Sequence, residues 1–125
     1  MTLSIGFVGL GSMGLPMARQ LLAAGHTVYG YDVVKAQLDA FRAAGGQPKA
    51  SPRDVADLVS LLLVVVATAD QAEAALFGPE GGAALLGEGG VVVLHSTVPP
   101  PFTEALAARL DEMGLLLLDA PISGG

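Results

Sequence analysis

Three glycines near the start of the chain have the residue type and spacing of a phosphate-binding turn. Gly9, Gly11 and Gly14 form a G-x-G-x-x-G pattern directly after the apolar run of residues 5–8. Gly9 is expected to permit a tight turn, Gly11 to let the backbone approach a pyrophosphate, and Gly14 to let the next helix pack closely. The unpaired N–H groups at the start of that helix, together with its dipole, would then face the negative charge.

A carboxylate at the end of the next apolar run extends this pattern. Asp32 closes the stretch of residues 27–32, where it can accept hydrogen bonds from both hydroxyls of a ribose. Because the chain contains 17 glycines, the glycine spacing alone is weak evidence. The spacing in frame with a strand, a helix and an acidic strand end predicts a dinucleotide site. A ligand-free turn, a solvated Asp32 and the similar glycine turn of methyltransferases remain alternatives.

Polar residues also follow the later apolar runs. Residues 66–71 are expected to leave a strand and begin a helix, with Asp70 as its cap and Gln71 facing either a ligand crevice or solvent. Ser96 and Thr97 offer hydroxyl and N–H groups to the same crevice, or else cap the following helix. His95 is expected to finish a strand and not to act as a catalytic base.

The last residues, 119–125, are mostly small. Their successive N–H groups form either a simple turn or a clasp for a carboxylate. The pattern stops at Gly125 directly after an expected strand, so we expect residues 1–125 to be one domain excised from a longer protein. Such a cut would leave an apolar surface that drives self-association into a homo-oligomer.

Composition excludes several classes of protein. Of the 125 residues, 52% are hydrophobic and 14% charged, which predicts one folded domain and excludes disorder. The net charge is −6 and the basic residues are scattered, so no nucleic-acid partner is expected. The absence of cysteine excludes disulfides and thiolate metal sites and is typical of a cytoplasmic protein. The longest apolar run, residues 61–67, is too short to span a membrane, and no metal site is expected.

The positions of these residues depend on elements that alternate between strand and helix. Apolar runs predict buried parallel strands at residues 5–8, 28–31, 61–67, 91–95 and 115–119, with a weaker strand at 46–50. Helices are expected at about residues 13–24, 34–44, 51–59, 70–77 and 101–113. This order predicts an α/β fold, a Rossmann-type doubly wound parallel sheet in three layers.

Taken together, the motifs resemble the N-terminal cofactor domain of the β-hydroxyacid dehydrogenases. This family includes 3-hydroxyisobutyrate dehydrogenase, tartronate semialdehyde reductase, L-threonate dehydrogenase and, more distantly, 6-phosphogluconate dehydrogenase. The resemblance covers nearly the whole chain and rests on residues 6–18, on Ser96-Thr97-Val98 with Pro100, and on residues 119–125.

The resemblance implies a role for each motif. The cofactor would be held by Gly9, Leu10, Gly11, Ser12, Met13, Gly14, Asp32, Val66, Ala67, Gln71 and Thr97. The substrate carboxylate would be held by Ser123, Gly124 and Gly125. The implied function is hydride transfer between a nicotinamide cofactor and a small β-hydroxyacid of the 3-hydroxyisobutyrate, threonate or tartronate semialdehyde/glycerate type.

Two departures from the family pattern limit this interpretation. Members that prefer NADP carry Asn-Arg after the second strand, whereas Asp32-Val33 stands here, so NAD is the expected cofactor. The family's catalytic lysine lies in a helical C-terminal domain that this chain does not include, and Lys35 and Lys49 are misplaced to replace it. No catalytic residue is therefore expected in this chain. A stand-alone dinucleotide-binding regulatory or sensor module remains the alternative.

Overall fold

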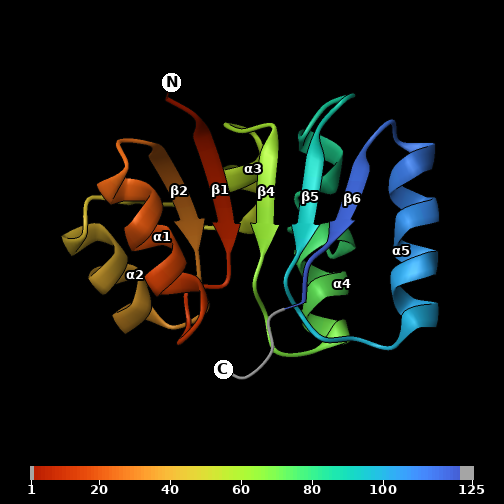
Figure 1. Cartoon of the computed structure of the whole chain (residues 1–125), viewed down its shortest axis with the longest axis horizontal. Coiled ribbons are helices and arrows are strands. Elements are labelled where there is room, and N and C mark those ends of the chain that lie inside the picture. Colours follow the sequence, from red (N-terminus) through yellow and green to blue (C-terminus); the bar gives the residue numbers. More distant parts are fainter. Residues whose placement is uncertain (1, 122–125) are drawn as a thin grey trace.

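The computed structural model describes residues 2–121, which form one sheet flanked by helices (Figure 1). The strands are β1 (Ser4–Val8), β2 (Thr27–Tyr31), β3 (Gln47–Pro48), β4 (Leu61–Val64), β5 (Val91–Leu94) and β6 (Leu116–Asp119). The helices are α1 (Gly14–Ala23), α2 (Lys35–Ala43), α3 (Pro52–Ala56), α4 (Ala69–Phe77) and α5 (Pro100–Glu112), with a short 3-10 helix, η1 (Ala83–Leu85).

All neighbouring strands of the sheet are parallel, in the order β3-β2-β1-β4-β5-β6. The chain first moves outward from β1 to β3 and then returns to the centre to place β4 beside β1. The expected Rossmann-type fold is confirmed. The strand order reverses between β1 and β4. This point matters for function, because ligands of such sheets bind in the crevice outside the carboxyl ends of the strands there.

Apolar side chains of the sheet and of the helices pack together on each face of the sheet. The helices and the sheet thus form the three expected layers. On one face, Phe7, Val28 and Leu63 pack with Leu15 of α1 and Phe41 of α2. On the other face, side chains of β4 and β5 pack with those of α3, α4, η1 and α5. Figure 1 shows α1 and α2 on the near side of the sheet, with α3 and α4 behind it. Strands with apolar side chains on both faces are stable only between two such layers.

Several elements are shorter than the apolar runs predict. Strand β4 ends at Val64 and β5 at Leu94, since the residues after them leave the sheet to form loops at its carboxyl edge. Helix α3 covers only Pro52–Ala56. The N-cap of α5 is Pro99 and has no side-chain hydrogen bond, so Ser96 and Thr97 do not cap that helix.

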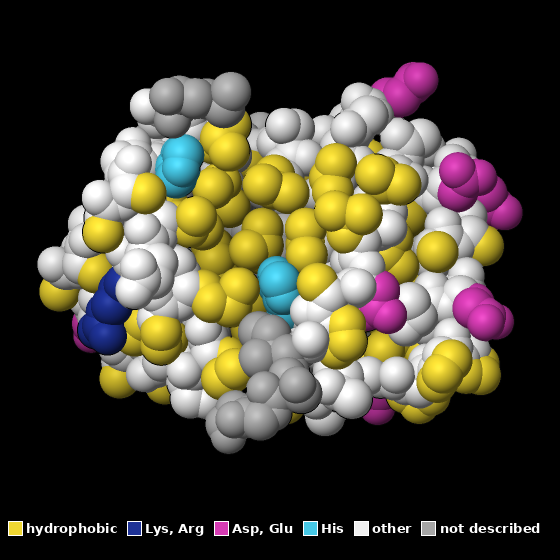
Figure 2. All heavy atoms as spheres, viewed as in Figure 1, with side chains coloured by type: hydrophobic (Ala, Val, Ile, Leu, Met, Phe, Trp, Pro, Cys, Tyr) yellow, Lys and Arg dark blue, Asp and Glu magenta, His cyan; other side chains and the backbone are white. Residues whose placement is uncertain are grey.

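The near face of the sheet is covered unevenly. Helices α1 and α2 lie over β2 and the β3 edge of the sheet, whereas Figure 2 shows apolar side chains gathered over the middle of this face. On the edge strand β6, Leu116 and Leu118 are 56% and 49% exposed. The expected uncovered apolar surface is therefore present over this part of the sheet. Among residues 2–121, no helix is long and apolar enough to cross a membrane.

Candidate functional site

A cleft of about 620 Å³ lies at the carboxyl edge of the sheet. Its walls come from the ends of β1, β2 and β4 and from the first turns of α4, so it lies at the reversal between β1 and β4. This is the position that the strand order predicts for a ligand crevice. The cleft brings together six residues that sequence analysis assigned to the cofactor: Gly9, Gly11, Asp32, Val66, Ala67 and Gln71.

Two of the three motif glycines are required by the packing of the chain itself. Gly9 has a φ of +105°, and a Cβ built on it would lie 1.9 Å from the carbonyl oxygen of Val65. A Cβ on Gly14 would lie 2.1 Å from the carbonyl oxygen of Gly9. Gly9 therefore permits the tight turn against β4, and Gly14 lets α1 approach that turn.

Gly11 differs from the other two, because nothing among residues 2–121 requires a glycine there. Its φ is outside the left-handed region, and a Cβ built on it would meet no heavy atom of these residues within 4 Å. The empty space beside it belongs to the cleft. A methyl group would fill this space, so the residues present fit a ligand whose phosphates approach the backbone at Gly11.

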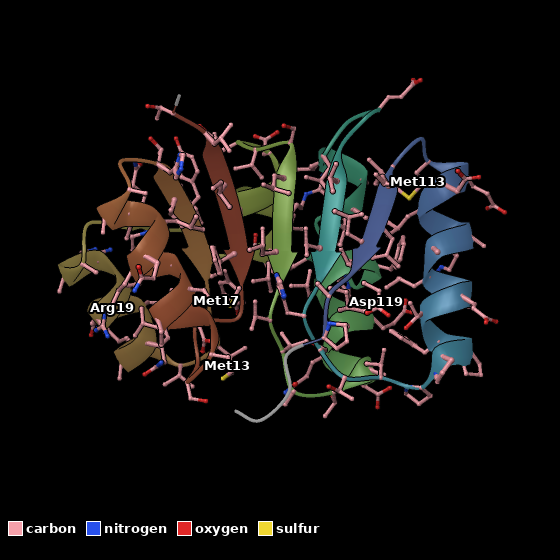
Figure 3. All side chains as sticks on the ribbon, viewed as in Figure 1. Met13, Met17, Arg19, Met113 and Asp119 are labelled. Atoms are coloured by element: carbon pink, nitrogen blue, oxygen red, sulfur yellow. The ribbon has the colours of Figure 1, made fainter. Side chains whose placement is uncertain are left out.

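The N-terminus of α1 follows the glycine turn and carries the positive end of the helix dipole. Its N-cap, Met13, makes no side-chain capping bond, and the first turn contains no acidic residue. In contrast, α3 and α4 are capped by the hydroxyls of Ser51 and Thr68. Within the first turn, the N–H of Leu15 donates to the carbonyl oxygen of Gly11 at 3.1 Å and Pro16 has no N–H, so the N–H of Gly14 and the helix dipole are what favour an anion at the start of α1. Figure 3 shows Met13 at this end of the helix, beside the carboxyl edge of the sheet.

Asp32 joins the end of β2 to the glycine turn. Its Oδ2 accepts a hydrogen bond from the N–H of Leu10 at 2.8 Å, and its Oδ1 accepts one from the N–H of Val34 at 2.8 Å. Each carboxylate oxygen can accept more than one hydrogen bond. The carboxylate is thus held in place at the cleft and keeps acceptor capacity for two hydroxyl groups.

Leu10 contributes through its backbone only, since its side chain is fully buried in the core. Its N–H donates to Asp32, and its carbonyl oxygen accepts a hydrogen bond from the side-chain amide of Gln37. Sequence analysis missed Gln37, which also lines the cleft. The signal that could have found it is a glutamine in the first turn of the helix that follows the acidic strand end.

Gln71 both lines the cleft and completes the cap of α4. Its Oε1 accepts hydrogen bonds from the N–H groups of Ala67 and Thr68, at 2.9 and 3.1 Å. Its own N–H donates to the hydroxyl of Thr68 at 3.1 Å. The prediction that Asp70 caps this helix is wrong, because the N-cap is Thr68, two residues earlier, which forms a reciprocal capping box with Gln71.

Ser96, in the loop after β5, forms two hydrogen bonds with the loop after β4. Its buried hydroxyl donates to the carbonyl oxygen of Val66 at 2.6 Å and accepts from the N–H of Val66 at 3.3 Å. Thr97 follows it, is exposed, and is not among the residues that line the cleft. Ser12, Met13 and Gly14 also lie outside this lining, at the start of α1.

His95 connects the ends of β5 and β6. Its Nδ1 lies 2.9 Å from the carbonyl oxygen of Ala120, one residue past Asp119, which Figure 3 labels at the end of β6. Its Nε2 is buried and has no hydrogen-bond partner among residues 2–121. His95 does not line the cleft. The expected substrate residues Ser123, Gly124 and Gly125 lie outside the described residues.

The electrostatics of the cleft are acidic. Asp32 and Glu80 line it, and among the described lining residues none is lysine or arginine. Lys35 pairs instead with Asp39 on the exposed face of α2, at 2.9 Å. Lys49 lies over the ring of Tyr29. An anion in the cleft would therefore be held by neutral donors, which are backbone N–H groups and the side-chain amides of Gln37 and Gln71. Within residues 2–121, no three acidic or histidine side chains come together as a metal site.

Comparisons with known proteins agree with this geometry. Residues 4–125 match a family model described as the NAD binding domain of 6-phosphogluconate dehydrogenase. The chain is 47% identical over 125 residues to an L-threonate dehydrogenase of Cupriavidus necator, covering 100% of this chain and 42% of that protein. It is 36% identical over 121 residues to the human mitochondrial 3-hydroxyisobutyrate dehydrogenase, covering 97% of this chain and 36% of that protein.

A solved structure shows the same fold. The 3-hydroxyisobutyrate dehydrogenase of Mycobacterium tuberculosis, in a structure with L-serine, superposes with a TM-score of 0.93 at 27% identity. The match covers 100% of this chain and 42% of that one. The chain thus spans about two fifths of the length of these relatives.

Proposed function

The chain belongs to the family of NAD-binding domains described for 6-phosphogluconate dehydrogenase, and from that premise we propose that it is the cofactor-binding part of a β-hydroxyacid dehydrogenase. The observation that carries the proposal is that Asp32 and the glycine turn meet in one cleft at the sheet reversal. The likeness to L-threonate and 3-hydroxyisobutyrate dehydrogenases favours this function over a stand-alone regulatory or sensor module.

In this proposal the backbone of residues 9–14 and the uncapped start of α1 hold the pyrophosphate of NAD. Asp32 accepts hydrogen bonds from the two hydroxyls of the adenosine ribose. The exposed side chain of Val33 and the apolar wall formed by Val66 and Ala67 offer surfaces that the adenine ring can cover. Thr97 would lie farther along the crevice, toward the nicotinamide. Bound NAD supplies a ring that accepts or donates a hydride.

NAD is the proposed cofactor rather than NADP because of charge. A 2′-phosphate would lie about 4 Å from the Asp32 carboxylate, where two like charges repel by up to ~4 kcal/mol at an effective dielectric constant near 20. Among the described lining residues, no lysine or arginine is present to offset this repulsion. After screening and rearrangement we expect about 1–3 kcal/mol, a preference of roughly tenfold to a hundredfold.

The proposed reaction is oxidation of a small β-hydroxyacid, or its reversal. The substrate class is a 3-hydroxyisobutyrate-like acid, threonate, or a tartronate semialdehyde/glycerate pair. Ser123, Gly124 and Gly125 would hold its carboxylate. The general acid or base would be a lysine of a helical domain beyond residue 125, because neither Lys35 nor Lys49 lines the cleft. We further infer a cytoplasmic, homo-oligomeric protein.

Calorimetric titration of the 125-residue chain with NAD and with NADP tests the cofactor. We expect NAD to bind at least tenfold more tightly, and tighter binding of NADP would overturn the assignment of Asp32. The reaction is tested by assaying the protein encoded by the complete reading frame with threonate, 3-hydroxyisobutyrate and glycerate. Absence of NADH formation with every one of these acids would refute the proposed substrate class.

A further inference from the structure

Gln37 links helix α2 to the glycine turn through one hydrogen bond. Its side-chain amide donates to the carbonyl oxygen of Leu10. Asp32, from the end of β2, accepts the N–H of the same residue. Both backbone polar groups of Leu10 are therefore engaged by side chains far away in the sequence, and Gln37 and Asp32 both line the cleft.

These two bonds determine how the turn presents its backbone to the cleft. The peptide group is planar and trans, so the carbonyl of Leu10 and the N–H of Gly11 point in opposite directions. When Gln37 holds the carbonyl toward α2, the N–H of Gly11 must point away from α2. The fully buried side chain of Leu10 fixes the position of its Cα between the two peptide planes.

Without the bond from Gln37, this peptide would have freedom to rotate. Among residues 2–121, no heavy atom lies within 4 Å of a Cβ built on Gly11, and glycine populates more of φ/ψ space than other residues. The carbonyl oxygen of Gly11 accepts the N–H of Leu15 at 3.1 Å, so the freedom concerns the Leu10–Gly11 peptide and not the peptide after it. Ordering such a residue on binding costs conformational entropy, so orienting it beforehand increases affinity.

We propose that Gln37 is a positioning residue that orients the Leu10–Gly11 peptide, so that the N–H of Gly11 faces the pyrophosphate before the cofactor binds. This inference rests on the proposed NAD function. The amide type suits the role, because it donates to a carbonyl without adding charge beside Asp32. A glutamate would place an acceptor against the Leu10 carbonyl, and a lysine or arginine would attract a 2′-phosphate.

The test compares Gln37→Met with a matched control, Gln20→Met, on the exposed surface of α1. Methionine keeps the length of the side chain and removes the donor. Calorimetry with ADP-ribose, which carries the pyrophosphate, should show affinity about threefold to tenfold lower for Gln37→Met and unchanged for the control. NMR titration with adenosine, which carries the ribose hydroxyls but no phosphate, should give equal affinities for both variants.

A second measurement reports the peptide directly. In the cofactor-free chain, we expect the amide resonance of Gly11 to broaden or shift in Gln37→Met. The melting temperature should fall by no more than about 6 °C, since one hydrogen bond contributes about 0.5–1.5 kcal/mol. If Gln37→Met folds poorly, Gln37→Leu serves in its place, because it also lacks the donor and adds no charge to the cleft.

The outcomes separate the two proposals. Failure of the unchanged chain to bind NAD or ADP-ribose refutes the proposed function itself. Tight binding of ADP-ribose by the unchanged chain and by Gln37→Met alike overturns only the role of Gln37. An equal loss of adenosine and ADP-ribose binding also overturns it, because that result indicates general damage to the cleft.

Discussion

Replacing Gly11 with alanine tests whether this glycine is required for ligand binding, whereas Gly9 and Gly14 are required for folding. An alanine Cβ would meet no heavy atom of the described residues within 4 Å, and the φ of Gly11 is one that alanine can adopt. The free energy of unfolding should therefore stay the same or rise by up to about 1 kcal/mol, because alanine restricts the unfolded chain. The substitution should therefore not destabilise the folded chain.

NAD binding should respond strongly to the same methyl group. Hydrogen bonds from backbone N–H groups to phosphate oxygens span about 2.7–2.9 Å, and a methyl group in the cleft keeps the phosphate from coming that close. Bonds to charged groups contribute about 1.5–3 kcal/mol each, so the loss of one bond lowers affinity roughly tenfold to a hundredfold.

Gly9→Ala is the matched control with the opposite expectation. Its Cβ would lie 1.9 Å from the carbonyl oxygen of Val65, and its φ of +105° is strained for any L side chain. We expect Gly9→Ala to lose about 3 kcal/mol of stability or more.

Thermal unfolding followed by circular dichroism and calorimetric titration with NAD measure the two effects for both variants. If Gly11→Ala bound NAD as tightly as the parent chain, the pyrophosphate could not lie against Gly11. If Gly11→Ala were as unstable as Gly9→Ala, the packing argument would be refuted.

Three further predictions concern selectivity, catalysis and association. Asp32→Asn removes the charge that opposes a 2′-phosphate, so the ratio of NADP to NAD dissociation constants should fall at least about tenfold by calorimetry; an unchanged ratio would contradict the charge argument. The 125-residue chain should form no NADH from 3-hydroxyisobutyrate, threonate or glycerate, because a positioned base typically contributes ~10²–10⁴-fold and no lysine lines the described cleft. Turnover that disappears in His95→Ala would instead identify His95 as the base. The chain should form dimers or larger species by light scattering, and Leu116→Lys combined with Leu118→Lys should shift it toward monomer, since both leucines are exposed on β6. Equal masses for the two proteins would show that this face does not drive association.

Local patterns in the sequence were sufficient to predict the architecture. Buried parallel strands and amphipathic helices differ in the spacing of their apolar residues, and glycine and proline mark their ends. The strand order β3-β2-β1-β4-β5-β6 needed the structure, because right-handed connections also allow other doubly wound orders. The glycine turn and Asp32 could be paired from sequence because each belongs to a recognisable strand end. The element boundaries were less accurate, as β4 and β5 end before their apolar runs do.

The cap of α4 shows that one local signal in the sequence was not used. Asp70 and Thr68 are both good cap residues. Thr68 is the cap, and the Oε1 of Gln71 accepts hydrogen bonds from the N–H groups of Ala67 and Thr68. The spacing from Thr68 to Gln71 was visible in the sequence, so this was a signal overlooked rather than one that was absent.

Only the tertiary structure revealed which side chains support the turn. Gln37 reaches Leu10 from 27 residues away, and His95 reaches Ala120 from 25 residues away. Nothing in the spacing of these residues marks them as partners. Their contacts arise because β1, β2 and α2 pack side by side, as do β5 and β6. A local pattern reports how a segment folds, whereas a hydrogen bond between distant residues depends on where the packed core places two segments.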